Sequence, residues 1–388
     1  MVLNAGSSSL KWTVLDADTE ATLTQGSTSW QGTEGGRHEA ALRAVLSDLP
    51  HVDAVGHRVV QGGVRLREAV VLDDRNRQLI ADLAELAPLH NPAALAGIEA
   101  AVAALPQVPQ VAAFDTAFHA TIPEPAALYP VPWEWTQRWG LRRFGFHGLS
   151  VQYAVRRTRE LLGTLPRCLV VCHLGSGCSV TAVLEGRSAN TSMGLTPMEG
   201  LMMARRSGSV DPGLLLYLVQ HAGITLTDLE RGLNEDSGLF GVSGVSADWR
   251  AVVAAATAGN PRAALARAMF LHRLVAAVGA MTATLGGLDA LVFTGGIGEN
   301  SAEVRQAVVD ALSFAGVRLA VSTDPTGPDS GDRDLAASDS RARVLVLAAR
   351  EDLTVLADVR RLVLSKGDSG CVRRGGQGGS FSAFGNRR

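Results

Sequence analysis

Three glycine-rich turns are the segments of this sequence best suited to hold phosphate groups. They lie at residues 4–9, 173–178 and 295–300, and each follows a stretch with the pattern of a β-strand. Glycine lets main-chain N–H groups approach an anion closely, and serine hydroxyls add further donors. The sequence contains neither the G-x-x-x-x-G-K-[ST] motif of P-loop proteins nor the H-R-D and D-F-G motifs of protein kinases. Three such turns outside those families indicate a nucleotide-binding protein.

Two arginines next to tight turns are candidates for binding anions. Arg58 precedes a glycine pair at the end of a predicted strand, and Arg206 lies in a polar turn. A guanidinium binds carboxylate or phosphate through two hydrogen bonds, so two of them could hold an anionic acceptor next to ATP. A single arginine is more often a surface ion-pair partner. His90 and His147 lie among apolar residues and turns, where a single histidine is more often a core residue than a catalyst.

Strands and helices alternate along most of the chain. Helices are predicted over residues 37–48, 75–87, 91–104 and 149–163, and several alanine-rich helices follow up to Leu285. Strands are predicted over residues 2–4, 11–16, 52–60, 110–115, 167–173, 179–185 and 288–294. This alternation predicts a mixed α/β architecture.

A short internal repeat suggests a duplication. Residues 6–16 and 175–185 both have the pattern of a glycine turn and a strand that ends in an acidic residue, at an offset of 169 positions (175 − 6). Two unrelated hairpins would explain a match of this length equally well, so the repeat alone leaves both interpretations open. A duplication would give two similar domains that each direct one hairpin tip at a shared cleft.

Length and charge limit the function further. The 388 residues are enough for two domains, and the formal net charge of −2 makes nucleic acid an unexpected partner. The longest uncharged apolar segment lies between Arg273 and Asp289. It is shorter than the roughly 18 to 20 residues that cross a bilayer, so we expect a buried helix and no membrane partner. The sequence reaches Asn4 without a secretory signal pattern, which favours a cytoplasmic location.

The cysteines and the C-terminal segment carry no predicted chemistry. The four cysteines lack both a C-x-x-C pair and a histidine at zinc-like spacing, so we expect small buried side chains; they are Cys168, Cys172, Cys178 and Cys371. Residues 365–388 consist mainly of Gly, Ser and Arg, and this composition predicts a disordered tail.

Seven segments together resemble one family. Residues 4–11 and the stretch around Phe146, His147 and Gly148 resemble the two signature sequences of the acetate kinase family. Five more segments resemble that family in the same order, so that the resemblance covers residues 2–364; they are residues 56–63, 87–92, 114–119, 191–211 and 293–300.

This resemblance implies a fold. The family belongs to the acetate and sugar kinase, actin and heat-shock chaperone superfamily, so we expect two duplicated actin-like (ribonuclease H-like) α/β domains around a nucleotide cleft. Domain I would comprise residues 1–115 plus 352–364, and domain II residues 116–351.

The resemblance also implies an activity. The expected reaction is reversible, direct in-line transfer of the ATP γ-phosphoryl group to acetate, which gives acetyl phosphate and ADP, with Mg²⁺ or alternatively Mn²⁺ as the metal and a homodimer as the assembly. By resemblance, Arg58 and Arg206 would hold the acetate carboxylate and the phosphoryl group, and His147 would donate to the phosphoryl oxygens. Acetate is already ionised at neutral pH and needs no strong base, so Asp115 would orient Arg58 or the metal shell.

The remaining site residues are expected by resemblance alone. His90 and His173 would support the catalytic groups, and Asn4 and Glu351 would lie next to the metal. The phosphate-side turns would be Ser7, Ser9 and Lys11, and His173, Leu174, Gly175, Ser176 and Gly177. The adenosine side would be Asp248, Trp249, Arg250, Gly296, Ile297, Gly298, Glu299 and Asn300. The acetate methyl group would contact Val60, Leu89, Phe146 and Pro197.

Three departures from the family pattern and two alternative functions stay open. Ser176 replaces an asparagine, Asn190 replaces an aspartate, and Val64 lies where an acidic residue is usual. One methylene changes the selectivity of an apolar pocket only about 10 to 200-fold, so a propionate or butyrate kinase is the first alternative. The second is a non-catalytic ATP-binding regulatory or chaperone-like module of the same fold, which the combination of Arg58, Arg206 and His147 disfavours.

Overall fold

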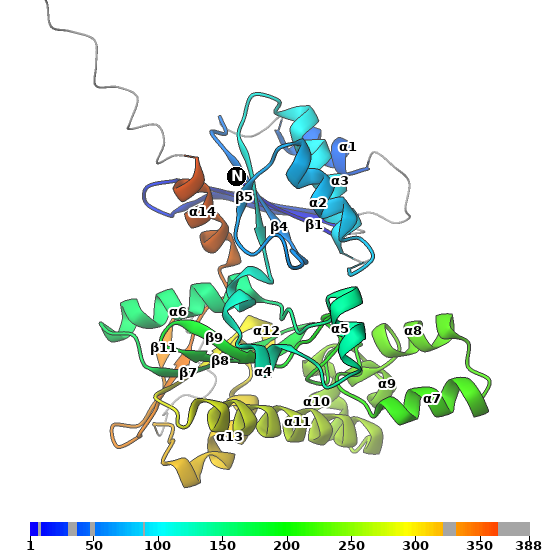
Figure 1. Ribbon diagram of the computed structural model, residues 1–388. Helices are drawn as coiled ribbons and strands as arrows, with labels where there is room; N and C mark the ends of the chain where they lie inside the picture. The colour runs from blue at the N-terminus through cyan, green and yellow to red at the C-terminus, as the bar shows by residue number, and fades with distance from the viewer. Residues whose placement is uncertain (7–8, 30–36, 47–50, 88–89, 321–330, 364–388) are drawn as a thin grey trace, which may run out of the picture.

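The chain forms two six-stranded mixed sheets (Figure 1). The computed structural model describes residues 1–6, 9–29, 37–46, 51–87, 90–320 and 331–363. The first sheet has the order β3 (Thr22–Ser29), β2 (Ser9–Leu15), β1 (Val2–Gly6), β4 (Val55–Val59), β6 (Gln110–Phe114), β5 (Val70–Val71). The second sheet has the order β11 (Arg333–Asp334), β12 (Arg343–Val346), β10 (Ala290–Thr294), β7 (Cys168–Leu174), β8 (Cys178–Leu184), β9 (Arg187–Thr191).

The two sheets share one strand pattern. In each, a first strand pairs antiparallel with the next strand of the chain and parallel with a later one, as β1 does with β2 and β4, and β7 with β8 and β10. Strand β8 begins and ends 169 positions after β2 (178 − 9 and 184 − 15), which is the offset of the sequence repeat. The predicted fold of two similar α/β halves is therefore confirmed.

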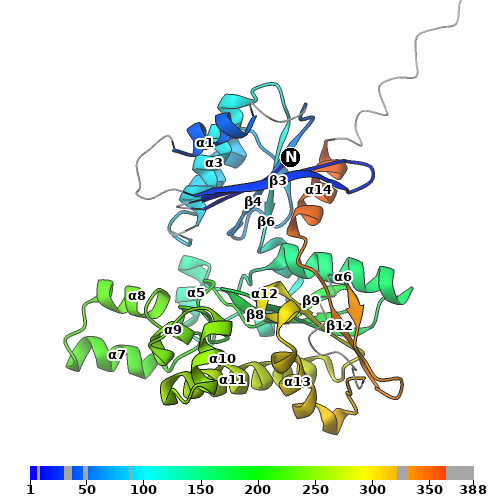
Figure 2. The ribbon, with the colours of Figure 1, turned by 180° about the vertical axis from the view of Figure 1, so that it is seen from behind.

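Helices cover both faces of the first sheet, as Figures 1 and 2 show from opposite sides. One face carries α1 (Arg37–Leu46), α2 (Asp74–Asp82) and α3 (Asn91–Ala104), and the other carries α14 (Glu351–Leu362). Strand residues alternate between these faces, because Leu3 and Leu10 pack with Leu42 of α1 whereas Val2 packs with Val355 of α14. The C-terminal helix thus completes the core of the N-terminal sheet.

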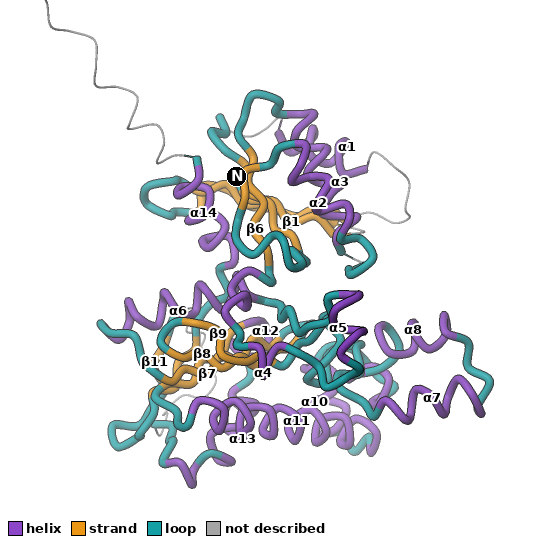
Figure 3. Tube along the Cα trace, viewed as in Figure 1, coloured by secondary structure: helices purple, strands orange, loops and turns teal. Residues whose placement is uncertain are grey.

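The second sheet lies between α6 (Gly148–Leu162) and α11 (Pro261–Leu285), which is seen most easily in Figure 3. Val170 packs with Phe270 of α11, whereas its neighbours Leu169 and Val171 pack with Val151 of α6. The remaining helices are α4 (Glu124–Ala127), α5 (Trp133–Trp139), α7 (Pro212–His221), α8 (Leu226–Asn234), α9 (Gly238–Ser243), α10 (Trp249–Thr257), α12 (Gly295–Asn300) and α13 (Ala302–Ala311), with 3-10 turns at Ala117–Thr121 and Ser313–Ala315.

Helix α11 differs from the expected short apolar segment. It has 25 residues, and by length and composition alone it could cross a membrane. Its buried stripe, which includes Phe270, Leu274 and Val278, packs into the core of the second sheet. This packing accounts for part of its apolar character, and the helix that the sequence predicts to be buried is buried along one stripe only.

Several predicted boundaries are wrong. Helix α2 ends at Asp82 rather than at residue 87, and β4 spans five residues instead of the predicted nine. Residues 295–300 form α12 rather than a turn. Strand β3 was not predicted, because its sequence is polar and most of its residues are exposed at the edge of the sheet. The three cysteines in the described part are free and buried, as expected, whereas Cys371 and the predicted tail at residues 365–388 lie outside the described residues.

Candidate active site

Arg58 lies at the end of the first sheet that faces the second sheet, and carboxylates surround it. Its Nε and Nη2 atoms donate to the two carboxylate oxygens of Asp115 at 3.1 and 2.6 Å. The Glu351 carboxylate, on the first residue of α14, is 3.0 Å from Nε, and the Asn4 amide oxygen accepts from Nη1 at 3.4 Å. Strands β4 and β6 are parallel neighbours, which brings Arg58 and Asp115 together. The single positive charge of Arg58 therefore has two carboxylate partners.

Burial and these ion pairs have opposite effects on the pKa values of Arg58 and Asp115. Burial alone would lower the pKa of Arg58, but the carboxylates of Asp115 and Glu351 outweigh it and raise that pKa. Burial raises the pKa of the Asp115 carboxyl, and the Arg58 guanidinium opposes this rise. The arginine is thus fixed in its charged form, in a defined orientation.

His147, just before α6, and His173, near the C-terminal end of β7, stack on each other with ring centroids 4.1 Å apart. Each ring is fixed through Nδ1, which lies 3.0 Å from the Ser179 hydroxyl for His147 and 2.8 Å from the Ser150 hydroxyl for His173. Burial lowers the pKa of His147 well below its usual value, and His173, Arg58 and other nearby cations lower it further. The lowered pKa favours the neutral imidazole of His147, and the tautomer in which Nδ1 accepts from the Ser179 hydroxyl carries its proton on Nε2.

The backbone of His147 is unusual as well. The residue precedes α6 with φ 60° and ψ 20°, in the left-handed region that non-glycine residues rarely adopt. Gly148 follows it, and its N–H donates to the Asp115 carbonyl at 2.8 Å. A side chain at position 148 would collide with that carbonyl, so the close passage of the two segments requires glycine.

The Arg206 side chain extends from a loop of the second half toward Gly177 and His147. Its Nη1 donates to the Pro197 carbonyl, which is the one hydrogen bond of this guanidinium within the described residues. Burial lowers the pKa of Arg206, and it has no carboxylate partner in that part of the chain. A Cβ at Gly177 would lie 2.7 Å from its Nη2 and 3.1 Å from His147 Nε2. Two potential donors thus converge on the glycine turn between β7 and β8.

His90 and Ser176 also lie near Arg206. Burial lowers the pKa of His90 to about 4, and the charges of Arg206 and Arg58 add to the shift, so His90 lies within electrostatic range of both arginines. Ser176 is exposed at the turn, and its carbonyl accepts from the Ala204 N–H at 3.2 Å. That hydrogen bond connects the turn to the loop that carries Arg206.

The expected adenosine residues lie at the start of α10, but they face different ways. Asp248 caps the helix and forms an exposed ion pair with Arg250 at 2.7 Å. Trp249 is buried, packs against Phe270, and donates from its indole N–H to the Ser301 hydroxyl at 3.1 Å. Trp249 therefore joins α10 to the start of α13, which places the 248–250 and 295–300 segments side by side.

The side chains of α12 mainly bind backbone. Glu299 accepts from the N–H groups of Gly295 and Ala349 at 2.9 and 3.0 Å, and Asn300 donates to the Gly296 carbonyl at 2.9 Å. Ile297 packs on the core of the second half, while Gly298 is buried. Of the other phosphate-side residues, Leu174 and Gly175 lie at the end of β7 and in the turn.

The expected acetate pocket is partly described. Val60, from the end of β4, and Phe146 lie in one buried cluster that otherwise consists of residues of the second half. Pro197 is half-buried, and Leu89 lies outside the described residues, as does Ser7. Lys11 is exposed on β2 opposite Asn4, and Ser9 is opposite Gly6.

The chemistry of the donors next to Arg58 fits a hydrated magnesium ion. Asn4 and Glu351 offer hard oxygen atoms and line a cavity of about 350 Å³ that also contacts Lys11. The described residues contain no cluster of three His, Cys, Asp or Glu side chains with metal-binding geometry. Mg²⁺ keeps several of its waters and needs only one or two protein carboxylates.

Sequence reasoning missed the serines that fix the two histidines, and also His119. His119 uses both ring nitrogens, Nδ1 with the Ser188 hydroxyl at 2.8 Å and Nε2 with the Phe146 carbonyl at 2.9 Å. A signal for Ser179 existed, because a hairpin that turns at residues 175–177 places Ser179 opposite His173. No local pattern points to Ser150 or Ser188.

The chain has clear relatives among known proteins. Residues 36–357 match the model of the acetokinase family. An acetate kinase from Nostoc punctiforme is 50% identical over 313 residues, which cover 80% of this chain and 76% of the relative. The crystal structure of Porphyromonas gingivalis acetate kinase is similar with a TM-score of 0.87 and 35% identity, over 93% of this chain and 98% of that one. A propionate kinase from Francisella tularensis subsp. tularensis is similar with a TM-score of 0.86 and 34% identity, over 93% and 99% of the two chains.

Proposed function

The chain belongs to the acetokinase family and has the activity of an acetate kinase, and we propose that it moves the ATP γ-phosphoryl group to acetate in one in-line step. The convergence of Arg206 Nη2 and His147 Nε2 on the Gly177 turn supports this proposal most strongly. A turn of this kind suits phosphate oxygens, and in-line transfer requires cations and donors around the transferring group rather than a strong base.

The two arginines have different roles in this proposal. Arg58 is held by Asp115 and Glu351, so it serves as a fixed guide for the acetate carboxylate. Arg206 has no carboxylate partner among the described residues, so its charge is available to the phosphoryl oxygens. His147 donates from Nε2 as the neutral imidazole.

The metal is proposed to bind next to Asn4 and Glu351. Mg²⁺ would neutralise part of the phosphate charge there, and Mn²⁺ could replace it. In the same proposal, Asp248 and Arg250 contact the adenosine, whereas the buried Trp249 packs inside the protein and holds the start of α10 in position.

Domain boundaries follow from the same proposal. Residues 1–115 plus 352–364 would form domain I and residues 116–351 domain II, and the packing of α14 on the first sheet supports this division.

A homodimer and a cytoplasmic location stay predictions. Exposed apolar side chains on α7, including Leu214, Leu216 and Tyr217, support a contact surface in domain II.

The preferred length of the acceptor is tested directly, because a propionate kinase has a closely similar structure. The test is to supply the purified protein with ATP, Mg²⁺ and either acetate, propionate or butyrate, and to trap the acyl phosphate with hydroxylamine. We expect the highest kcat/KM with acetate, because Val60 and Phe146, which the resemblance assigns to the methyl pocket, lie in one buried cluster. Each added methylene should lower kcat/KM by about 10 to 200-fold. Preference for a longer acid would identify a propionate or butyrate kinase. ATP binding without any acyl phosphate would indicate the non-catalytic module.

A further inference from the structure

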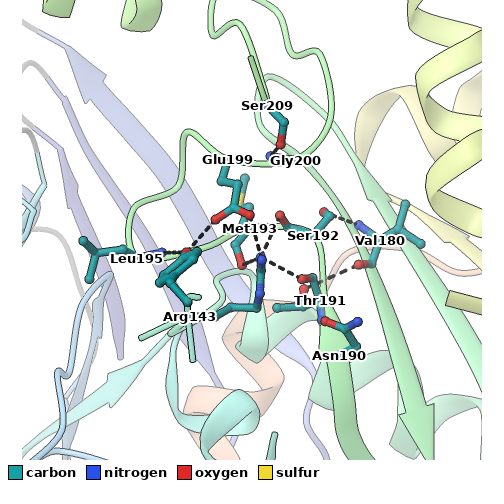
Figure 4. Close-up of polar contacts among 11 residues, drawn as sticks. Arg143, Val180, Asn190, Thr191, Ser192, Met193, Leu195, Glu199, Gly200 and Ser209 are labelled. Atoms are coloured by element: carbon teal, nitrogen blue, oxygen red, sulfur yellow. Dashed lines mark hydrogen bonds and ion pairs between the residues drawn. The ribbon is translucent and has the colours of Figure 1, made fainter. Parts of the chain in front are cut away.

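The loop at residues 191–200 continues from the end of strand β9 in the second sheet, and several polar side chains hold it (Figure 4). Its Pro197 carbonyl accepts the one hydrogen bond that Arg206 makes within the described residues. Its far end is joined to the segment that carries Arg206, because the Gly200 N–H donates to the Ser209 hydroxyl at 3.0 Å and the Ser209 N–H donates to the Gly200 carbonyl at 2.9 Å. The loop is therefore one of the elements that hold Arg206, and the one that its guanidinium contacts.

Arg143 holds the start of the loop. Its Nη1 lies within hydrogen-bond distance of three consecutive carbonyls, those of Thr191, Ser192 and Met193, at 3.1, 3.1 and 3.0 Å. Its Nη2 pairs with the Glu199 carboxylate at 2.7 Å, near the end of the same loop. The Arg143 side chain is only 16% exposed, so these interactions are partly shielded from solvent. One guanidinium thus bridges both ends of the loop.

Tyr129 closes the network from the other side. Its hydroxyl donates to the second oxygen of Glu199 at 2.5 Å and accepts from the Leu195 N–H at 2.8 Å. Burial raises the pKa of Tyr129, and the adjacent Glu199 carboxylate raises it further, so the phenol stays protonated as this donor. The Arg143 guanidinium also lies 5.7 Å from the centre of the Tyr129 ring.

The middle of the loop packs against the same groups. The N–H groups of Phe144 and Gly145 both point at the Gly194 carbonyl, at 3.0 and 3.2 Å. A Cβ at Gly194 would collide with the Glu199 carboxylate and the Tyr129 hydroxyl. The loop has therefore little space to move while these three groups are in place.

We propose that Arg143, Glu199 and Tyr129 form a clamp that positions Arg206 for phosphoryl transfer through the Pro197 carbonyl. Arg143 is then a positioning residue. The inference rests on the proposed function, since it assigns Arg206 to the transferring group. Arg206 lacks the paired carboxylates that orient Arg58, so the loop has to supply its orientation. A displacement of about 1 Å in such a group can cost about 10²-fold in rate.

The clamp also bears on acceptor selectivity. Pro197 is expected to line the pocket for the acetate methyl group, so a loosened loop changes pocket size together with the position of Arg206. The nucleotide side is held by other elements, including α12 and the start of α10. Loss of the clamp should therefore change KM for acetate far more than KM for ATP.

The test compares Arg143→Gln with Arg142→Gln in the full-length enzyme, using acyl hydroxamate formation. Arg142 is the matched control, because it is the neighbouring arginine and its guanidinium makes no hydrogen bond to another described residue. For Arg143→Gln we expect kcat/KM for acetate to fall about 10²-fold, KM for ATP to stay within about twofold, and the acetate-to-propionate ratio to fall. Arg143→Lys should recover part of the loss, and Arg142→Gln should behave as the wild type.

Other outcomes would overturn the clamp. An equal rise in KM for acetate and for ATP, an unchanged acetate-to-propionate ratio, or an equal effect of Arg142→Gln would each show that Arg143 has only a structural role. If Arg143→Gln fails to fold, Tyr129→Phe and Glu199→Gln each remove one link and undergo the same measurements, with a fall of about tenfold expected for acetate alone. A wild-type enzyme that forms no acetyl hydroxamate would refute the proposed function itself. An active wild type with unaffected variants would refute only the clamp.

Discussion

On the side of the first sheet, Arg58 extends from a strand and meets two carboxylates and an amide oxygen, whereas on the side of the second sheet Arg206 extends from a loop and meets one carbonyl. Both guanidinium groups are largely shielded from solvent. Carboxylates raise the pKa of the first, and burial lowers the pKa of the second. The same residue type is thus held by charge in one half and by the shape of a loop in the other.

This difference separates two tasks that a single arginine would perform poorly. A guanidinium with two carboxylates is rigid, but its charge is largely compensated before any substrate arrives. An unpaired guanidinium keeps its full charge for the phosphoryl oxygens, at the cost of needing external support. Substitutions at the two positions should therefore differ in their effects on activity and on stability.

Replacement of Arg206 should have the largest effect on turnover. In Arg206→Gln we expect kcat to fall by about 10³-fold or more, because the main charge opposite the transferring group is lost, with little change in the free energy of unfolding.

Arg58→Gln should lose activity and also about 3 to 5 kcal/mol of stability, because it leaves the buried Asp115 carboxylate without its partner. Acyl hydroxamate formation and urea unfolding measure the two quantities. A stability loss in Arg206→Gln as large as that in Arg58→Gln would contradict the comparison.

The sequence predicts much of the frame that holds these arginines. The glycine turns, the strands that flank them and the offset of 169 positions between β2 and β8 are all readable, because hairpins depend on neighbouring residues. Strand β3 was missed because a polar edge strand lacks apolar alternation, and α12 was missed because its glycines favour turns over helices.

Side-chain contacts over long sequence distances are much harder to predict. The structure places Asp115 against Arg58, a contact that the family resemblance suggests and that no local pattern contains. The ion pair of Arg143 with Glu199 spans 56 positions and depends on the path of a loop without regular structure. Periodicity carries no information about such a path, so the clamp was not predicted from the sequence.

Ser179 offers a smaller test on the side of the second sheet. Its hydroxyl lies 3.0 Å from His147 Nδ1, so in Ser179→Ala the neutral ring can carry its proton on either nitrogen. We expect kcat to fall about tenfold, with KM for ATP unchanged, and the ¹⁵N shifts of the His147 ring to report a mixture of tautomers. Ser150→Ala, which removes the equivalent partner of His173, should affect turnover less. Unchanged ¹⁵N shifts in Ser179→Ala would exclude this role of the serine.

The smallest effect on turnover is expected for His57, a buried histidine that precedes Arg58 on β4. Burial lowers its pKa to about 4, whereas the unfolded chain binds a proton below about 6.5. The unfolded state therefore binds more protons between these values, and stability falls as the pH is lowered through this range, by about 2 kcal/mol at pH 5. In His57→Gln the loss of unfolding free energy between pH 7 and pH 5 should shrink by that amount, while turnover at pH 7 stays unchanged. His119, another buried histidine, has a similarly lowered pKa of about 4, but its Nε2 also lies 2.9 Å from the Phe146 carbonyl, so His119→Gln should reduce turnover as well. Equal turnover in the two variants, measured beside urea unfolding at both pH values, would show that the position of Phe146 does not depend on His119.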